Sequence, residues 1–336
     1  MHKRNRIAIS RIALTIIVVV LIVVVGVAAV YATMQKPSAP STVAVTLGIP
    51  VKASYQFMPL YYGLNNSYFA KDGVSLTITP FTGDAPLSTA VASGNIQVGV
   101  DDVFGVEHMI ATGVPIKIIA QLSSIDDFVL IVNAKSHIQK PSDLNGAKIG
   151  VTTIPSVVYD LALDYAKTNN VNITPVALGA VPAQIAAMQQ NQTQGFIWTL
   201  DQGYALQARG IGQIFANFTS YYTNYKTDNV VFASDNMIQN QSSTLKNLLK
   251  GIFGSVNAVE QNLTASSEFL ASFQNMPLNA ATQTLADSSA IFTSDGTIDP
   301  TGIAFSIQFD QGLNLITGTP PQATSTYTTQ FTPVSS

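Results

Sequence analysis

The stretch GAKIGVTTIPSVVYD, from Gly146 to Asp160, has the pattern of a strand, a tight turn and a helix. Residues 147–151 form a short apolar run typical of a buried strand, and Ser156 can cap a helix. The apolar residues that follow recur at helical spacing: Val157, Val158, Leu161, Ala162 and Tyr165. Such a unit leaves backbone N–H groups unpaired at the helix start, where small ligands bind in open α/β sheets. The sequence therefore predicts a ligand site beside this turn.

Strand-like and helix-like segments alternate along the rest of the chain. We expect further strands at residues 43–47, 76–78, 96–100, 116–120, 176–178, 195–198 and 213–215. We expect helices that begin near Pro59, Asp84 and Val103, and helices over 183–190, 200–209 and 245–263. In the first of these helices, Leu60, Leu64 and Tyr68 give the apolar stripe. This alternation favours an α/β fold with mainly parallel sheets.

Two other apolar runs lack the alternating pattern of a half-exposed strand. They are Phe128–Val132 and Asn229–Ala233, the second of which is apolar after its first residue. We interpret both as hinge strands by which the chain passes into a second lobe and returns. The expected lobes are lobe 1, at residues 43–127 and 234–316, and lobe 2, at residues 128–233 with the hinge strands.

The N-terminal segment has the features of a membrane anchor. Residues 12–34 carry no charge, and this length can cross a bilayer, which takes about 20 apolar residues. Four basic residues precede the run and favour an N-terminus inside and a body outside. We expect residues 1–34 to form a cytoplasmic tip and a single-pass transmembrane helix, with a cleaved signal peptide as the alternative. Residues 35–42 read as a linker, and the Thr- and Pro-rich residues 317–336 as a disordered tail.

Composition excludes several classes of protein. The 336 residues include no cysteine, which excludes disulfides, thiolate metal sites and a lipid-modified cysteine anchor. From Ile12 onward the chain has 12 basic and 19 acidic residues, a net charge of −7, and Arg209 is its only arginine. An acidic body with one arginine is a poor binder of phosphate backbones, so we expect no nucleic-acid partner.

Five motifs, in their order and spacing, resemble the extracellular solute-binding proteins of ABC importers, in the nitrate/sulfonate/taurine and thiamine-precursor family. They are PLYYGLNNSYFAKDGVSLTITPF (59–81), GDAPLSTAVASGNIQVGVDD (83–102), GVPIKIIAQL (113–122), IQKPSDLNGAKIGV (138–151) and GFIWTLDQG (195–203). The resemblance spans residues 42–313. It implies a type II periplasmic-binding-protein fold, in which two doubly wound lobes joined by two hinge strands trap a solute. It also implies an importer permease and ATPase as partners, a monomer and no cofactor.

The same resemblance implies that loops at the carboxyl ends of strands line the cleft. In lobe 1 these loops contain Ser54, Tyr55, Gln56, Gly83, Asp84, Asp101, Asp102, Ser123 and Ser124. In lobe 2 they contain Thr152, Thr153, Ser156, Trp198, Asp201, Asp228 and Asn229. Thr152 and Thr153 are the leading candidates, because their hydroxyls and the helix-start amides suit a polar ligand. Asp84 and Asp101 can equally cap helices, and Trp198 can equally belong to the core.

The candidate loops leave the ligand and the class of function open. They hold acids and hydroxyls with Lys52 as the only nearby cation, so no arginine clamp for an anion is present. Amides and hydroxyls alone can hold a sulfonate or taurine, whereas a thiamine-pyrimidine-like amine would stack on Trp198 or Tyr55. The alternatives are a ligand-binding sensor or surface protein, and an enzyme like the thiamine-pyrimidine synthases. The absence of cysteine and of catalytic sequence motifs argues against the enzyme.

Overall fold

The computed structural model describes residues 42–335, except 53, 125–126, 221–225, 289–290 and 317–318. The chain divides into two units, residues 1–41 and residues 42–336, and everything below concerns the second. The anchor expected at residues 1–34, and the linker up to residue 41, lie outside the described residues. Within the described part of the chain, no helix is both long and apolar enough to span a membrane.

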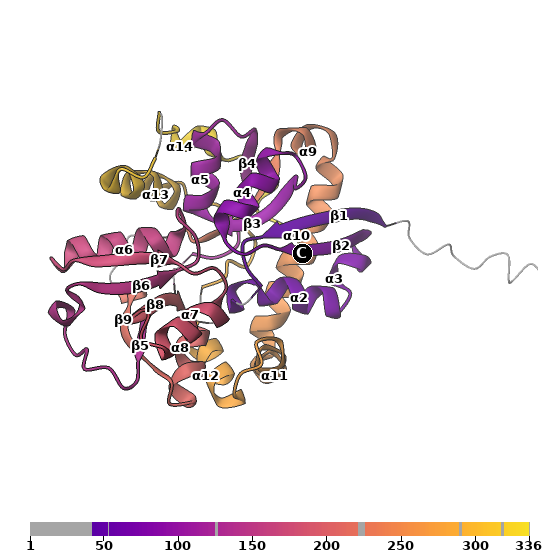
Figure 1. The fold of residues 1–336 in the computed structure, drawn as a ribbon. Helices are drawn as coiled ribbons and strands as arrows, with labels where there is room; N and C mark the ends of the chain where they lie inside the picture. The colour runs from indigo at the N-terminus through magenta and orange to yellow at the C-terminus, as the bar shows by residue number, and fades with distance from the viewer. Residues whose placement is uncertain are drawn as a thin grey trace, which may run out of the picture. The chain divides into compact units, whose positions relative to one another are not determined.

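The first sheet has five strands in the order β2-β1-β3-β10-β4 (Figure 1). Its strands are β1 (Val43–Ile49), β2 (Val74–Pro80), β3 (Val98–Asp102), β4 (Ile116–Gln121) and β10 (Asn229–Ser234). β1 runs parallel to β2 and β3, whereas β10 lies antiparallel between β3 and β4. The carboxyl ends of β1, β2 and β3 therefore meet at one edge, together with the start of β10.

The second sheet repeats this arrangement in the order β7-β6-β8-β5-β9. Its strands are β5 (Phe128–Asn133), β6 (Ala147–Val151), β7 (Ile173–Ala177), β8 (Gly195–Thr199) and β9 (Gly212–Asn217). β6 runs parallel to β7 and β8, and β5 lies antiparallel between β8 and β9. The two lobes thus share one topology, with the strand that arrives from the other lobe in the fourth place.

The chain passes between the sheets just before each of the two apolar runs. It leaves the first sheet after β4 and enters the second at β5, and it returns after β9 to β10. Each of these strands nevertheless lies wholly in one sheet, so β10 belongs to lobe 1 and not to lobe 2 as expected. The first five residues of both strands are buried, because both faces of each sheet are covered, and this explains their unbroken apolar pattern.

Helices flank both sheets (Figure 1). In lobe 1 they are η1 (Tyr55–Phe57), α2 (Met58–Asn65), α3 (Tyr68–Lys71), α4 (Asp84–Ala92) and α5 (Val103–Ala111). In lobe 2 they are η2 (Pro141–Leu144), α6 (Val157–Thr168), α7 (Val181–Gln189), α8 (Leu200–Ala208) and η3 (Phe218–Ser220). The remaining helices are α9 (Asp235–Asn240), α10 (Ser242–Gln261), α11 (Leu263–Phe273), α12 (Leu278–Ser288), α13 (Pro300–Leu313) and α14 (Ala323–Thr326).

The C-terminal helices contact both lobes, which corrects the expectation that residues 234–316 belong to lobe 1 alone. α10 packs on α2 and α3 of lobe 1, whereas α12 packs on α8 of lobe 2. α13 contacts α5 of lobe 1 and α6 of lobe 2. These helices therefore tie the two lobes together in addition to the two crossings of the chain.

The C-terminal tail is ordered over residues 319–335, contrary to the predicted disorder. Tyr327 pairs with Ile118 of β4, Phe331 is buried, and the N–H of Val334 donates to the carbonyl of Asp295 at 2.8 Å. The tail thus covers β4, which would otherwise be an exposed edge of the sheet. The prediction of disorder relied on the Thr- and Pro-rich composition and overlooked the few apolar residues that hold the tail in place.

Two predicted helices end earlier than their apolar stripes suggested. The helix that begins near Pro59 ends at Asn65, and Ser67 has φ 61°, so Tyr68 starts a separate helix and Leu64 is exposed. The long helix ends at Gln261, and Asn262 caps the next one by accepting from the N–H of Ala265 at 3.2 Å. An apolar residue one turn further along is therefore insufficient to extend a helix past a turn or a cap.

Candidate functional site

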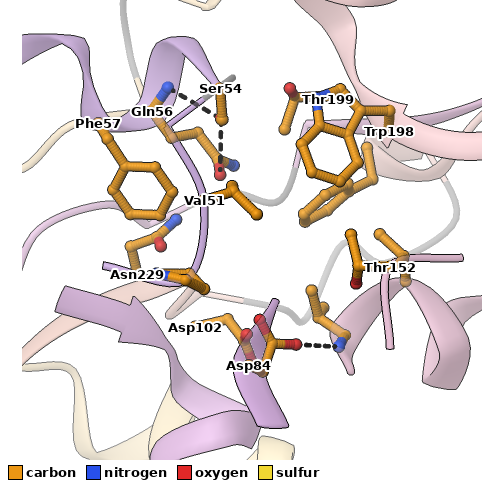
Figure 2. Close-up of a pocket in the computed structure, with 14 residues that line it drawn as sticks. Val51, Ser54, Gln56, Phe57, Asp84, Asp102, Thr152, Trp198, Thr199 and Asn229 are labelled. Carbon is orange, nitrogen blue, oxygen red and sulfur yellow. Dashed lines mark hydrogen bonds between the residues drawn. The ribbon is translucent and has the colours of Figure 1, made fainter. Parts of the chain in front are cut away.

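A cavity of about 380 Å³, partly open to solvent, lies between the two sheets (Figure 2). Lobe 1 lines it with Pro50, Val51, Ser54, Gln56, Phe57, Asp84, Asp102 and Asn229. Lobe 2 lines it with Phe128, Thr152, Val157, Val158, Trp198 and Thr199. These residues follow the carboxyl ends of the parallel strands or begin the two antiparallel ones. The cavity thus lies at the edge where ligands bind in open α/β sheets.

The stretch around Gly146–Asp160 forms the predicted strand, turn and helix at this edge. β6 ends at Val151, Thr152 lines the cavity, and Ser156 caps α6 by accepting from the N–H of Tyr159 at 3.2 Å. The apolar stripe of this helix is buried as predicted. Thr153 does not line the cavity, because its hydroxyl donates to the carbonyl of Pro155 at 3.0 Å.

Three polar side chains of the lobe 1 wall are held by contacts with backbone amides. Ser54 caps η1 by accepting from the N–H of Gln56 at 3.2 Å. Asp102, and not Asp101, caps α5 through the N–H of Gly105 at 2.8 Å. Asp84 does not cap its own helix, because its Oδ2 accepts from the N–H of Val157 in lobe 2 at 3.3 Å. The lobes are therefore in contact at the rim of the cavity.

Apolar and uncharged polar side chains form the rest of the wall. Figure 2 shows Trp198 and Thr152 on one side of the cavity, with Phe57 and Asn229 on the other. Trp198 is buried in the lobe 2 core and also lines the cavity, so both expected roles apply to it. A flat aromatic face among hydroxyl and amide groups suits a small organic solute with both polar and apolar parts.

Gln56 lines the cavity and also connects the two segments by which the chain crosses between the lobes. Its Nε2 donates to Asp127 Oδ1 at 2.6 Å and to Asp228 Oδ2 at 3.0 Å. Asp228 Oδ2 also accepts from Ser123 Oγ at 2.9 Å and from Asn229 Nδ2 at 2.7 Å. All five side chains are buried. Asp228 and Ser123, expected as ligand contacts, thus belong to a network that fixes the hinge.

The structure places the other expected residues outside the cavity. Tyr55 is fully buried and packs edge-on against Phe292, with ring centroids 6.3 Å apart. Ser124 donates to the carbonyl of Ile291 at 3.2 Å, and buried Asp201 accepts from Thr199 Oγ1 at 2.6 Å. These side chains thus contact other parts of the protein and do not line the cavity.

Two more expected residues lie next to the lining without being part of it. Gly83 has φ 134°, and a Cβ there would lie 2.6 Å from Thr153 Cγ2. Asp101 is buried, and its Oδ1 accepts from the N–H of Asp102 at 3.0 Å. Gly83 therefore allows the close approach of the lobes, and Asp101 places a further carboxyl group behind the wall.

Several lining residues and one hinge residue were missed by sequence reasoning. Val51, Phe57 and Thr199 line the cavity from loops that had been singled out for other residues. Asp127 comes directly before the apolar run of β5, and this position was the only signal for it. Apolar lining residues give no signal of their own, because the same residue types fill the core.

The wall of the cavity is acidic. Burial and the neighbouring charge of Asp102 raise the pKa of Asp84 and of Asp101, and burial raises the pKa of Asp102 to about 6. Among the described residues that line the cavity there is no lysine or arginine. Lys52 instead lies with its Nζ 5.7 Å from the ring centroid of Tyr61. The site thus offers acids, hydroxyls and amides to a ligand.

Among the residues that the structure describes, two groups of side chains have the composition of a metal site. Carboxylate oxygens of Asp84, Asp101 and Asp102 lie within 4.8 Å of one another beside the cavity. One ligand atom each from His108, Asp160 and Asp310 also lie within 4.8 Å of one another. The first group is all carboxylate, whereas the second adds an imidazole.

Three solved structures show what the fold resembles. The alkanesulfonate-binding protein SsuA from Xanthomonas axonopodis pv. citri, bound to MOPS, is 17% identical, with a TM-score of 0.70 over 85% of this chain and 96% of that one. The periplasmic aliphatic sulphonate binding protein SsuA from Escherichia coli is 16% identical, with a TM-score of 0.67 over 84% and 97%. The periplasmic nitrate-binding protein NrtA from Synechocystis PCC 6803 is 13% identical, with a TM-score of 0.59 over 72% and 70%.

These likenesses confirm the two-lobed periplasmic-binding-protein fold expected from the sequence. No curated protein matches the sequence. Residues 54–262, more than half of the chain, match the family described as NMT1/THI5 like. This match also confirms the family suggested by the five sequence motifs. The chain therefore belongs to the NMT1/THI5-like family.

Proposed function

We propose that this protein captures a small organic solute between its lobes and delivers it to an ABC importer composed of a permease and an ATPase. The observation that carries the proposal is the cavity between the two sheets. At its rim, the side chain of Asp84 in lobe 1 accepts a hydrogen bond from the backbone N–H of Val157 in lobe 2. A ligand that contacts both walls favours the arrangement in which the walls face each other. The structural neighbours are binding proteins by their names, and this supports a binding role for this chain rather than an enzymatic one.

The proposal includes a position outside the cell and a monomeric state. The uncharged run at residues 12–34, with basic residues before it, supports a single-pass anchor that holds the body near the permease. Each lobe contributes one wall of the same cavity, so one chain supplies a complete site.

For the solute, the lining favours a polar organic molecule that is neutral or cationic. Asp84 and Asp102 face the cavity without a lysine or arginine among the lining residues, which disfavours a small anion such as nitrate. A thiamine-pyrimidine-like amine would pair with these acids and stack on Trp198. The names of two structural neighbours make sulfonates the second group, and taurine is chemically a sulfonate. The hydroxyl of Thr152 and nearby amides would hold such a solute.

Thermal shift with the full-length protein tests this function. The panel contains aminopyrimidines, taurine, aliphatic sulfonates and nitrate. A solute that binds only the folded protein raises its melting temperature in proportion to the logarithm of the solute concentration. We expect a rise with the wild type, and a smaller rise with Thr152→Val and Trp198→Ala. A solute that stabilises both variants as much as the wild type would contradict binding between the lobes.

A further inference from the structure

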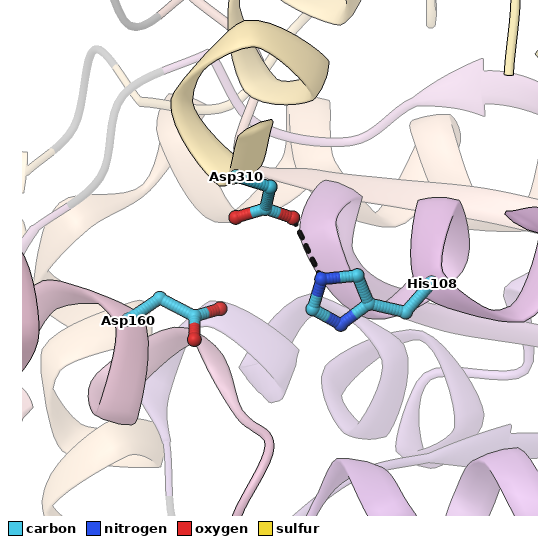
Figure 3. A group of neighbouring side chains, drawn as sticks. All are labelled: His108, Asp160 and Asp310. Carbon is cyan, nitrogen blue, oxygen red and sulfur yellow. Dashed lines mark ion pairs between the residues drawn. The ribbon is translucent and has the colours of Figure 1, made fainter. Parts of the chain in front are cut away.

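A second group of titratable side chains lies apart from the lining of the solute cavity (Figure 3). His108 comes from α5 of lobe 1, Asp160 from the first turn of α6 in lobe 2, and Asp310 from α13. His108 Nε2 lies 2.7 Å from Asp310 Oδ2. One nitrogen and two carboxylate oxygens thus converge from three elements that are far apart in the sequence.

Asp160 is the feature that calls for a ligand. Its side chain is 0% exposed, and neither carboxylate oxygen has a hydrogen-bond partner among the described residues. Figure 3 shows this carboxylate directed toward the His108–Asp310 pair. A buried carboxylate without a donor is costly, so proteins neutralise it with a proton, a basic side chain or a metal ion.

The surroundings of Asp160 are negative. Burial raises the pKa of Asp160, and the charges of Asp310, Asp102 and Asp84 raise it further. Besides burial, three acidic side chains therefore lie close enough to Asp160 to make the electrostatic potential there negative. The same potential attracts a positive ion, which would stabilise all of these carboxylates in their charged form.

A hollow of about 480 Å³ gives access to the group. It is partly open to solvent, and His108, Asp160, Asp84 and Ser156 are among the residues that line it. It shares Asp84 and Val157 with the lining of the solute cavity, and its other lining residues come from the starts of α4 and α6, from the turn before α6 and from α5. An ion can therefore reach the group, and water can complete its coordination.

We propose that His108, Asp160 and Asp310 form a binding site for a divalent transition-metal ion, with Zn²⁺ as the best match. One imidazole and two carboxylates are ligands that zinc accepts, with a water molecule in the fourth position. Mg²⁺ and Ca²⁺ prefer all-oxygen sites with six or more ligands. Two ligands at about 2.0–2.2 Å from a tetrahedral zinc lie about 3.4 Å apart. His108 Nε2 and Asp310 Oδ2, now 2.7 Å apart, would therefore separate slightly around the ion, and the Asp160 oxygen already lies within 4.8 Å of both ligand atoms.

Such an ion would also hold the lobes in the arrangement described here. Its ligands come from lobe 1, lobe 2 and the C-terminal helix that contacts both. An ion bound by both lobes favours the state in which both sets of ligands meet. The three ligands of the ion do not line the solute cavity, so either assignment can fail without the other.

The test uses the full-length protein after treatment with a chelator. Zn²⁺ at about 100 times its dissociation constant should raise the melting temperature by about 5 °C, and calorimetry should give one ion per chain. Mg²⁺ and Ca²⁺ should produce no rise at the same concentration. Asp160→Asn and Asp310→Asn should each weaken zinc binding at least tenfold. Asp164→Asn, one turn further along α6, is the matched control and should bind zinc like the wild type.

Two outcomes would overturn the proposal. One is a melting temperature that zinc leaves unchanged in the wild type. The other is zinc binding in Asp160→Asn that is as tight as in the wild type, which would place the ion elsewhere, for example at His2 or His137. Asp160→Asn removes a buried acid without changing its size, so without metal it should melt at or above the wild-type temperature. That measurement separates loss of the site from loss of the fold.

Discussion

Asp84 Oδ2 accepts a hydrogen bond from the backbone N–H of Val157 at 3.3 Å, and this bond joins the starts of two helices in different lobes. The N-terminus of α6 carries partial positive charge, so a carboxylate there is stabilising. Gly83, the residue before Asp84, approaches Thr153 in the turn before α6. The start of α4 thus meets the turn that opens α6, and this contact forms the rim of the proposed solute site.

Gly83→Ala should open the lobes. Its φ of 134° is strained for alanine, and the new Cβ would lie 2.6 Å from Thr153 Cγ2 in the other lobe. We expect a larger radius of gyration by small-angle scattering and solute affinity that is at least tenfold lower. Gly94→Ala is the control, because Gly94 has φ 77° with nothing near its Cβ position. It should cost about 1–2 kcal/mol of stability without opening the lobes. Equal radii for the two variants would show that Gly83 does not control closure.

Thr152→Val should weaken solute binding, whereas Thr153→Val should not. Thr152 lines the cavity, but the hydroxyl of Thr153 is already used by the carbonyl of Pro155. Loss of one hydrogen bond to the solute corresponds to a threefold to tenfold loss of affinity, or about 0.5–1.5 kcal/mol. Isothermal titration of the solute found by thermal shift measures both variants. An equal effect of the two substitutions would mean that the solute does not contact Thr152.

Gln56→Leu should destabilise the hinge. The substitution removes the amide that donates to Asp127 and Asp228, and it leaves both buried carboxylates without that donor. We expect a loss of about 1–3 kcal/mol in the free energy of unfolding, measured with urea. Gln311→Leu, at an exposed position on α13, is the matched control and should change stability by less than about 0.5 kcal/mol. Similar losses of unfolding free energy in the two variants would contradict a specific role of Gln56 in the hinge.

Local pattern predicted the elements that make the site but not the contacts between them. The strand, the Ser156 cap and the buried stripe of α6 follow from residues that are close together in the sequence. The parallel strands also predicted which loops lie together at one edge. The same rule could not tell which side chain turns inward, so Thr152 and Thr153 looked equivalent in the sequence.

Contacts between distant segments gave no signal in the sequence. Gln56, Asp127 and Asp228 meet only because both crossings of the chain pass the first loop of lobe 1. Asp84 looked like a cap for its own helix, and the partner it actually has lies 73 residues away. Packing of the tail on β4 likewise depends on an edge that exists only in the folded sheet.

Stability should fall as the pH rises from about 4 to 7. Burial raises the pKa of Asp102 and of Asp127 to about 6, and that of Asp201 to about 7, from an ordinary value of 3.8. In this window the unfolded chain releases protons that the folded chain keeps, so raising the pH favours unfolding. Calorimetry should show a melting temperature that decreases over this range.

The variant Asp201→Asn tests the source of this pH dependence. The asparagine cannot ionise, so the decrease in melting temperature between pH 4 and 7 should be shallower than in the wild type. A melting temperature that rises across this range in the wild type would mean that these acids are charged in the folded protein.

A crystal structure of the protein with the solute identified by thermal shift tests the central claim most directly. We predict that its electron density lies between the two sheets, in contact with Thr152 and Trp198 on one side and with Asp102 or Asn229 on the other. Density for the solute on the outer surface of one lobe, with the space between the sheets filled only by water, would contradict the account.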